Sequence, residues 1–243
     1  MGRRHPRQGV TARGARVQEG REGGGEGEEL TPIPAVAPRG PGDPRPVPRF
    51  TRAELDALRG TTVEPLLGPG LKLLFVGINP GLWTAATRTH FAHPGNRFYP
   101  ALVAAGILPW LPQFAAGLDD AERATIVEAG VGIANLVDRA TARADELDRA
   151  ELRAGAERLA DLVAEHRPAV VAVAGITAYR QGFGRAKAVS GEQPEGIAGA
   201  RLWVVPNPSG LNAHDTVASL SRAYAEPARA AGIPGAGGDA PLA

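Results

Sequence analysis

Long apolar runs alternate with polar and amphipathic segments along this chain. Three runs are almost wholly apolar: residues 71–77 (LKLLFVG), 169–175 (AVVAVAG) and the start of 201–210 (RLWVVPNPSG), which continues into a loop. Continuous apolar runs of this length are typical of strands that are buried on both faces of a parallel sheet. The shorter apolar segment 131–137 (VGIANLV) predicts one more strand.

Helix signals separate these runs. Thr51 and Glu54 form a capping box that opens a short helix reaching Leu58, and Asp148 with Glu151 forms a second one at the start of a long amphipathic helix. Other helices are expected at residues 96–106, beginning on an Asn N-cap, and at 119–130, 178–181 and 215–232, the last kinked or interrupted near Pro227. In the long helix, one face carries Leu152, Ala156, Leu159 and Val163.

Strands that alternate with helices predict an α/β layered domain around a mainly parallel sheet. In such sheets ligands bind beyond the carboxyl ends of the strands. Two unusual loops follow strands there, GINPG at 77–81 and PNPSGLN at 206–212. We expect the packing of the domain to bring them together across a cleft.

The composition of the two ends of the chain predicts where the folded domain begins and ends. Residues 1–49 hold 18 Gly and Pro residues and few large apolar ones, so we predict a disordered extension, then a domain at 50–233 and a flexible tail at 234–243. Residues 1–18 contain five Arg and no acid, which leaves open a basic arm that touches phosphates, a spacer, or an over-long gene start.

Charge and residue usage narrow the class of protein. Residues 50–243 carry 18 basic and 20 acidic side chains, so charge alone does not indicate nucleic-acid binding. The absence of cysteine excludes disulfides and cysteine-based zinc sites. No apolar run approaches the roughly 20 residues that span a membrane, and no signal peptide is visible, so we expect an intracellular soluble protein without membrane partners.

The GINPG loop lacks the spacing of a P-loop or a dinucleotide fingerprint. Gly77 and Gly81 permit close backbone approach, and Pro80 stiffens the turn. The amide of Asn79 cannot act as a general base near neutral pH, but its oxygen can orient a water molecule. The alternative is that Asn79 only satisfies the backbone of the turn as an Asx residue.

The next segment, THFAHPGNRFYP at 89–100, gathers aromatic and polar side chains before a helix. Phe91 is a candidate to stack on a planar heterocycle, whereas Phe98 is expected in the core. His90 and His93 lack an evident third ligand, so they do not indicate a strong metal site.

The loop PNPSGLNAH at 206–214 offers polar groups and bare backbone that suit phosphate contact. Leu211 stands between Gly210 and Asn212 at the expected tip of the loop. An apolar side chain there is a candidate wedge between base pairs. The alternative is an ordinary turn with Leu211 folded inward.

Taken in order, the segments GINPGLW, FAHPGNRFY, NLVDRAT, AYRQGF and VVPNPSGLN resemble the mismatch-specific uracil-DNA glycosylases of the Mug/TDG family, over about residues 64–226. The resemblance implies a three-layer α/β/α sandwich, a monomer that flips uracil out of a G·U mismatch in double-stranded DNA and hydrolyses its N-glycosidic bond. Thymine and etheno-cytosine are further bases that it allows. It implies no metal or cofactor, and a cytoplasmic, nucleoid-associated location.

The resemblance also assigns roles. Asn79 would position the attacking water, and Phe91 would stack on the flipped base, with backbone amides near Ile78 and Phe91 reading the uracil edge. The remaining substrate-binding positions are Gly77, Ile78, Pro80, Gly81 and Asn96, and the DNA-binding positions are Asn207, Ser209, Gly210, Leu211 and Asn212, with Leu211 as the wedge.

Two departures within the superfamily shape this hypothesis. The fast uracil-specific branch has Asp at the position of Asn79 and His at that of Asn207, so we expect a slow enzyme that works by positioning and electrostatics. Some relatives carry Arg where Ala213 stands, followed here by His214, which leaves recognition of the opposite guanine open. The alternative function is a catalytically weak protein that senses mismatches, and the presence of Asn79 favours the enzyme.

Overall fold

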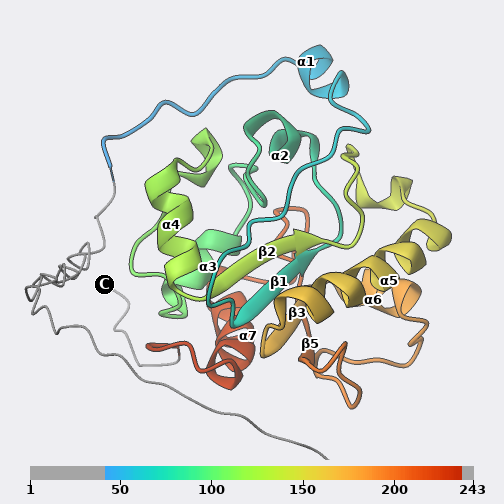
Figure 1. Cartoon of the computed structure of the whole chain (residues 1–243). Coiled ribbons are helices and arrows are strands. Elements are labelled where there is room, and N and C mark those ends of the chain that lie inside the picture. The colour runs from blue at the N-terminus through green and yellow to red at the C-terminus, as the bar shows by residue number, and fades with distance from the viewer. Residues whose placement is uncertain (1–41, 237–243) are drawn as a thin grey trace, which may run out of the picture. The chain divides into compact units, whose positions relative to one another are not determined.

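A computed structural model describes residues 42–236, and a five-stranded sheet lies at its centre (Figure 1). The strand order is β2-β1-β3-β5-β4, with β1 at Leu73–Gly77, β2 at Val131–Asn135, β3 at Val170–Ala174, β4 at Gly191–Glu192 and β5 at Arg201–Val205. All neighbours pair in parallel except the short β4, which is antiparallel to β5. The predicted mainly parallel sheet is confirmed, and β4 is an addition to it.

Helices cover both faces of the sheet, which confirms the predicted three layers (Figure 1). One face carries α3 (Phe98–Ala104), α4 (Asp120–Glu128) and α7 (Val217–Ala230), and the other carries α5 (Arg149–His166) and α6 (Ile176–Gly182). The short helices α1 (Arg52–Asp56) and α2 (Leu82–Thr87) and the 3-10 turns Phe114–Ala116 and Ala144–Glu146 lie in the connections. Of these four, only α1 was predicted.

The alternation of side chains along β1 divides the core into two clusters. Phe75 points to the layer of α3 and α7, where its ring lies 5.2 Å from that of Phe98. Its neighbours Leu74 and Val76 point to the opposite layer and pack with α5, including Leu159. Because each strand residue is buried on one face or the other, the strand reads as a continuous apolar run.

The helix signals hold with small corrections. Both predicted capping boxes are present, at Thr51 and at Asp148. On α5 the buried face includes Gly155 in place of the expected Ala156, because the carbonyl of Leu136 would lie 2.1 Å from a Cβ at this glycine.

Several helix details also differ from the prediction: α1 ends at Asp56 rather than Leu58, and α6 spans Ile176–Gly182 rather than 178–181. The N-cap of α3 is Arg97 rather than Asn96, although the side chain of Asn96 still accepts the Phe98 N–H at 2.9 Å. Helix α7 continues through Pro227 and is not interrupted there. The proline lies in the last turn of the helix, where it removes one backbone hydrogen bond close to the end.

Residues 42–49 contain no helix or strand, but they contact the domain. The Arg45 guanidinium bonds to the carboxylate of Glu122 on α4, and the Arg45 N–H donates to Gln113. The other residues of the predicted extension, 1–41, and residues 237–243 of the predicted tail lie outside the described residues. Within the described range, no helix combines the length and hydropathy that a membrane crossing requires.

Candidate functional site

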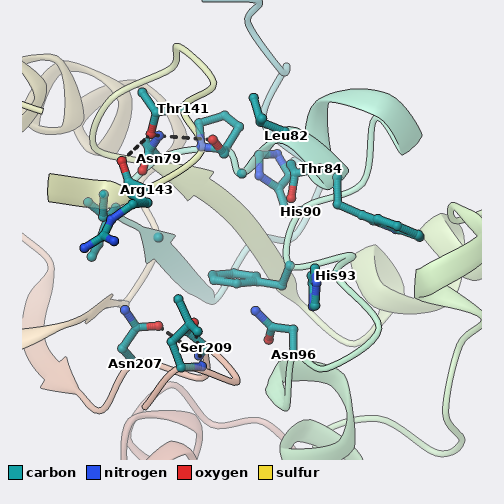
Figure 2. Close-up of a pocket in the computed structure, with 18 of the residues that line it drawn as sticks. Asn79, Leu82, Thr84, His90, His93, Asn96, Thr141, Arg143, Asn207 and Ser209 are labelled. Carbon is teal, nitrogen blue, oxygen red and sulfur yellow. Dashed lines mark hydrogen bonds between the residues drawn. The ribbon is translucent and has the colours of Figure 1, made fainter. Parts of the chain in front are cut away.

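The two unusual loops meet at the carboxyl ends of the parallel strands, as expected. They line one cavity of about 740 Å³ (Figure 2). Figure 2 shows Asn79, Thr141 and Arg143 on one side of it, and Asn207 and Ser209 on another. Every predicted site residue except Asn212 lines this cavity: Gly77, Ile78, Asn79, Pro80, Gly81, Phe91, Asn96, Asn207, Ser209, Gly210 and Leu211.

The side-chain amide of Asn79 is held in one orientation. Its nitrogen has three acceptors, the carbonyl oxygens of Pro80 (3.0 Å) and Arg139 (3.2 Å) and the hydroxyl of Thr141 (2.7 Å). The Thr141 hydroxyl donates its own hydrogen to the carbonyl of Arg143 at 2.7 Å, so toward Asn79 it can only accept. The oxygen of the amide therefore faces away from these groups, and it has no partner within residues 42–236.

The backbone around Asn79 is braced by the segment that follows β2. Leu136 N–H donates to the Gly77 carbonyl at 2.9 Å, and Thr141 N–H donates to the Pro80 carbonyl at 3.1 Å. The parallel pairing of β1 and β2 is thus extended into the loop. In the described part of the chain, the Asn79 oxygen accepts no backbone N–H, but its nitrogen satisfies the backbone carbonyls of Pro80 and Arg139, so Asn79 also supports the turn, as the alternative expected.

Phe91 forms one wall of the cavity in a constrained conformation. Its φ is 56°, in the left-handed region, which costs a non-glycine residue about 1 kcal/mol or more. Its ring stacks on Phe98, with centroids 4.1 Å apart. The Tyr99 hydroxyl, whose pKa is raised by burial and which therefore stays protonated, donates to the His90 carbonyl at 3.0 Å. These contacts hold the backbone before Phe91 in place.

A hydrogen-bonded pair, the buried His90 and the half-buried Asn135, lies behind Phe91. The Nε2 of His90 lies 2.9 Å from the Glu64 carbonyl, which can only accept, so Nε2 carries the hydrogen. Burial lowers the pKa of His90, which keeps the ring neutral at pH 7 and makes Nδ1 an acceptor for the Asn135 amide at 3.1 Å. The Asn135 oxygen then lies over Gly77, 2.5 Å from where a Cβ would stand there, so only glycine fits.

The loop after β5 presents Leu211 to solvent, with 93% of its surface exposed, so the alternative of an inward Leu211 is wrong. The Asn207 oxygen accepts the Ser209 N–H at 3.0 Å, and its nitrogen points toward Gly175 at the end of β3. Asn212 does not line the cavity, and its side chain bonds to the Asn207 carbonyl at 3.0 Å.

The profile of the Uracil DNA glycosylase superfamily matches residues 65–228. This chain belongs to the Uracil DNA glycosylase superfamily. Membership implies a DNA glycosylase, a hydrolase that removes uracil from DNA in repair. The match covers the sheet, both cavity loops and the segment that carries Phe91.

From the sequence alone, no role in shaping the cavity was assigned to His90, Asn135 or Thr141. His90 was considered only as a metal ligand. Asn135 and Thr141 both lie in or at the end of the quoted NLVDRAT segment, so the signal was present without an assigned role. Within residues 42–236, no group of three or more His, Asp or Glu side chains is placed to hold a metal ion.

Proposed function

We propose that this protein is a mismatch-specific glycosylase of the Mug/TDG type, which removes uracil from G·U pairs in double-stranded DNA as a monomer. The observation that carries the proposal is the fixed amide of Asn79 at the cavity wall, with its nitrogen bound by three acceptors and its oxygen free within the described residues. An oxygen held in this way is suited to accept a hydrogen bond from a water molecule and to direct that water at a sugar carbon.

The cavity suits a base taken out of the duplex. An enzyme that attacks the sugar carbon of a stacked nucleotide must extrude it first, and the exposed Leu211 supplies an apolar side chain to fill the vacated space. One face of the Phe91 ring is covered by Phe98, and the residue borders the cavity, which leaves a platform for a planar base. Within residues 42–236, the N–H groups of Ile78 and Phe91 make no hydrogen bond, so they are open to the edge of the base.

In the reaction, the bond between the base nitrogen and the sugar C1′ breaks, and the oxygen of water bonds to C1′. Uracil leaves as an anion and takes up the proton that water loses, which yields an abasic site and free uracil. The transition state resembles an oxocarbenium ion, as in glycoside hydrolysis. The backbone donors near Ile78 and Phe91 stabilise the departing anion, because fixed dipoles in a water-poor cavity act strongly on developing charge.

The positions of Asn79 and Asn207 lack the charged or titratable side chains that would make this chemistry fast. Amides stand at both Asn79 and Asn207. The nearby His90 is buried and neutral, and its Nδ1 accepts a hydrogen bond from Asn135, so it is not free to bond to a substrate. The enzyme therefore depends on positioning, and we propose a low turnover number. The cavity volume of about 740 Å³ also leaves room for thymine or etheno-cytosine.

A base-release assay tests the proposal. Duplexes that contain G·U, A·U or G·T are incubated with excess protein, and strand cleavage at abasic sites is followed with time. The proposal predicts release from G·U that is faster than from A·U. Equal rates on G·U and A·U would contradict mismatch specificity, and intact G·U duplex would favour a protein that only senses mismatches.

A further inference from the structure

Arg97 ties the segment that carries Phe91 to the loop that carries Leu211. Its guanidinium donates to the carbonyl oxygens of Ser209, Asn212 (2.7 Å) and Asp215. Its backbone N–H donates to a fourth carbonyl, that of Pro208, at 3.0 Å. Arg97, which directly precedes α3, thus makes four hydrogen bonds to a single loop more than 110 positions away in the chain.

None of these four acceptors of the partly buried Arg97 is a carboxylate. All four acceptors are backbone carbonyls, and the nearby Asp215 carboxylate bonds instead to the Asn212 amide (2.8 Å) and the Ser219 hydroxyl (3.0 Å). The Nε of Arg97 is buried and has no partner within the described residues. A guanidinium has a rigid fork of donors, so several carbonyls bound to it are fixed relative to one another.

The loop is also pressed against the segment before α3. A Cβ at Gly210 would lie 2.7 Å from the carbonyl oxygen of Gly95, so the backbones approach as closely as glycine allows. The residue that follows, Leu211, is nevertheless the most exposed of the large hydrophobic residues in the described chain. The loop therefore exposes an apolar side chain to water, while its backbone is held by Arg97 and packed against Gly95.

We propose that Arg97 is a positioning residue that keeps the wedge loop, residues 206–216, in its inserting shape before DNA arrives. This inference rests on the proposed function, because a wedge matters only when a base leaves a duplex. A loop already fixed loses little conformational entropy on insertion, so more of the binding energy remains for extruding the base. Because Phe91 lies six residues before Arg97, the same segment also sets the distance between stacking wall and wedge.

Kinetics of paired substitutions test the proposal. Arg97→Met should lower the rate of uracil release from a G·U duplex by about tenfold or more, as expected when a reacting group is misplaced, and lower release from single-stranded DNA much less. Arg97→Lys should rescue little, because one ammonium cannot span the three carbonyls. In a Leu211→Ala background, Arg97→Met should not change the ratio of duplex to single-strand rates further.

The matched control is Arg180→Met, which removes a guanidinium bound to the Ala188 carbonyl and should leave the rate ratio at the wild-type value. An Arg97→Met variant that loses duplex and single-strand rates equally, or adds fully to Leu211→Ala, would show a structural role only and overturn the proposal.

Hydrogen exchange separates this proposal from the proposed function. Amides of residues 206–216 should be protected in the free wild-type protein and exchange at least about tenfold faster in Arg97→Met, whether or not either protein cleaves uracil. Unchanged exchange in this loop would overturn the role of Arg97 even if the wild type is an active glycosylase. Faster exchange together with an inactive wild type would support the loop assignment and reject the glycosylase.

Discussion

The Asn79 side-chain nitrogen lies 2.7 Å from the Thr141 hydroxyl oxygen, although the two residues are 62 positions apart in the chain. The Thr141 hydroxyl donates onward to the Arg143 carbonyl, so the direction of each bond in this chain is set. A buried threonine thereby decides which end of the Asn79 amide faces the cavity. Under the proposed mechanism, which uses no charged base, this orientation is the main requirement for placing water.

Replacement of Thr141 should therefore impair catalysis through the orientation of Asn79. Thr141→Val keeps the shape but removes the acceptor, so Asn79 can turn, and we expect single-turnover uracil release to fall by about 10- to 100-fold. Thr141→Ser keeps the hydroxyl and should stay close to wild type. Affinity for G·U duplex, measured by fluorescence anisotropy, should be similar in all three. A Val variant at the wild-type rate would show that the Asn79 orientation does not depend on Thr141.

Asn79→Asp should not convert this protein into a fast enzyme. A carboxylate at this position would present oxygen to the carbonyls of Pro80 and Arg139, where the amide now presents hydrogen. Two acceptors facing each other without a donor cost about 1–3 kcal/mol, so we expect a lower Tm than for Asn79→Ala and no gain in rate. Thermal melts and single-turnover rates check this. An Asp variant that is both stable and faster than wild type would contradict the inference that the surroundings of residue 79 accept an amide and not a carboxylate.

The burial of His90 should make the free energy of unfolding depend on pH. Because burial lowers the pKa of His90, the unfolded chain takes up a proton below about pH 6.5 before the folded chain does. The free energy of unfolding should therefore fall between about pH 7 and about pH 5, and less steeply in His90→Gln. Urea unfolding at both pH values measures the slope, with exposed His214→Gln as the control for removing an imidazole. Parallel slopes in wild type and His90→Gln would rule out this contribution.

The boundary of the stable domain should lie before Arg45 rather than at residue 50. Glu122 is buried, and its carboxylate bonds to Arg45 and to the N–H groups of Gln113 and Asp119. Deletion of residues 1–41 should leave the unfolding free energy unchanged, whereas deletion of residues 1–49 should lower it. Since Arg45 is partly exposed, we expect the free energy of unfolding to fall by about 3 kcal/mol, which is the low end of the cost of breaking a buried ion pair.

Two comparisons check this boundary. Chemical denaturation of both truncated proteins gives the difference, and Arg45→Met in the full chain should reproduce most of it. If both truncations are equally stable, the contact between Arg45 and Glu122 does not contribute to the domain.

The sequence predicted the layers, the strand ends and the facing loops because these follow from local patterns. Apolar runs such as residues 71–77 indicate buried parallel strands, and parallel strands bring the loops after them to one edge. The contacts of Asn135 with His90 and of Thr141 with Asn79 could not be predicted, because they depend on the register in which Gly77 pairs with Asn135. The positive φ of Phe91 depends likewise on packing from Phe98 and Tyr99, which no local pattern specifies.

The proposed glycosylase activity depends most on Asn79, and its sharpest test is single-turnover release of uracil from a G·U duplex by wild type and Asn79→Ala. Both proteins should bind the duplex with similar affinity, and Asn79→Ala should remain folded at the assay temperature. We expect wild type to release uracil and Asn79→Ala to be slower by about 100-fold or more, the loss typical of removing a group that positions or stabilises the reacting atoms. An Asn79→Ala variant that releases uracil as fast as wild type would contradict this role of Asn79.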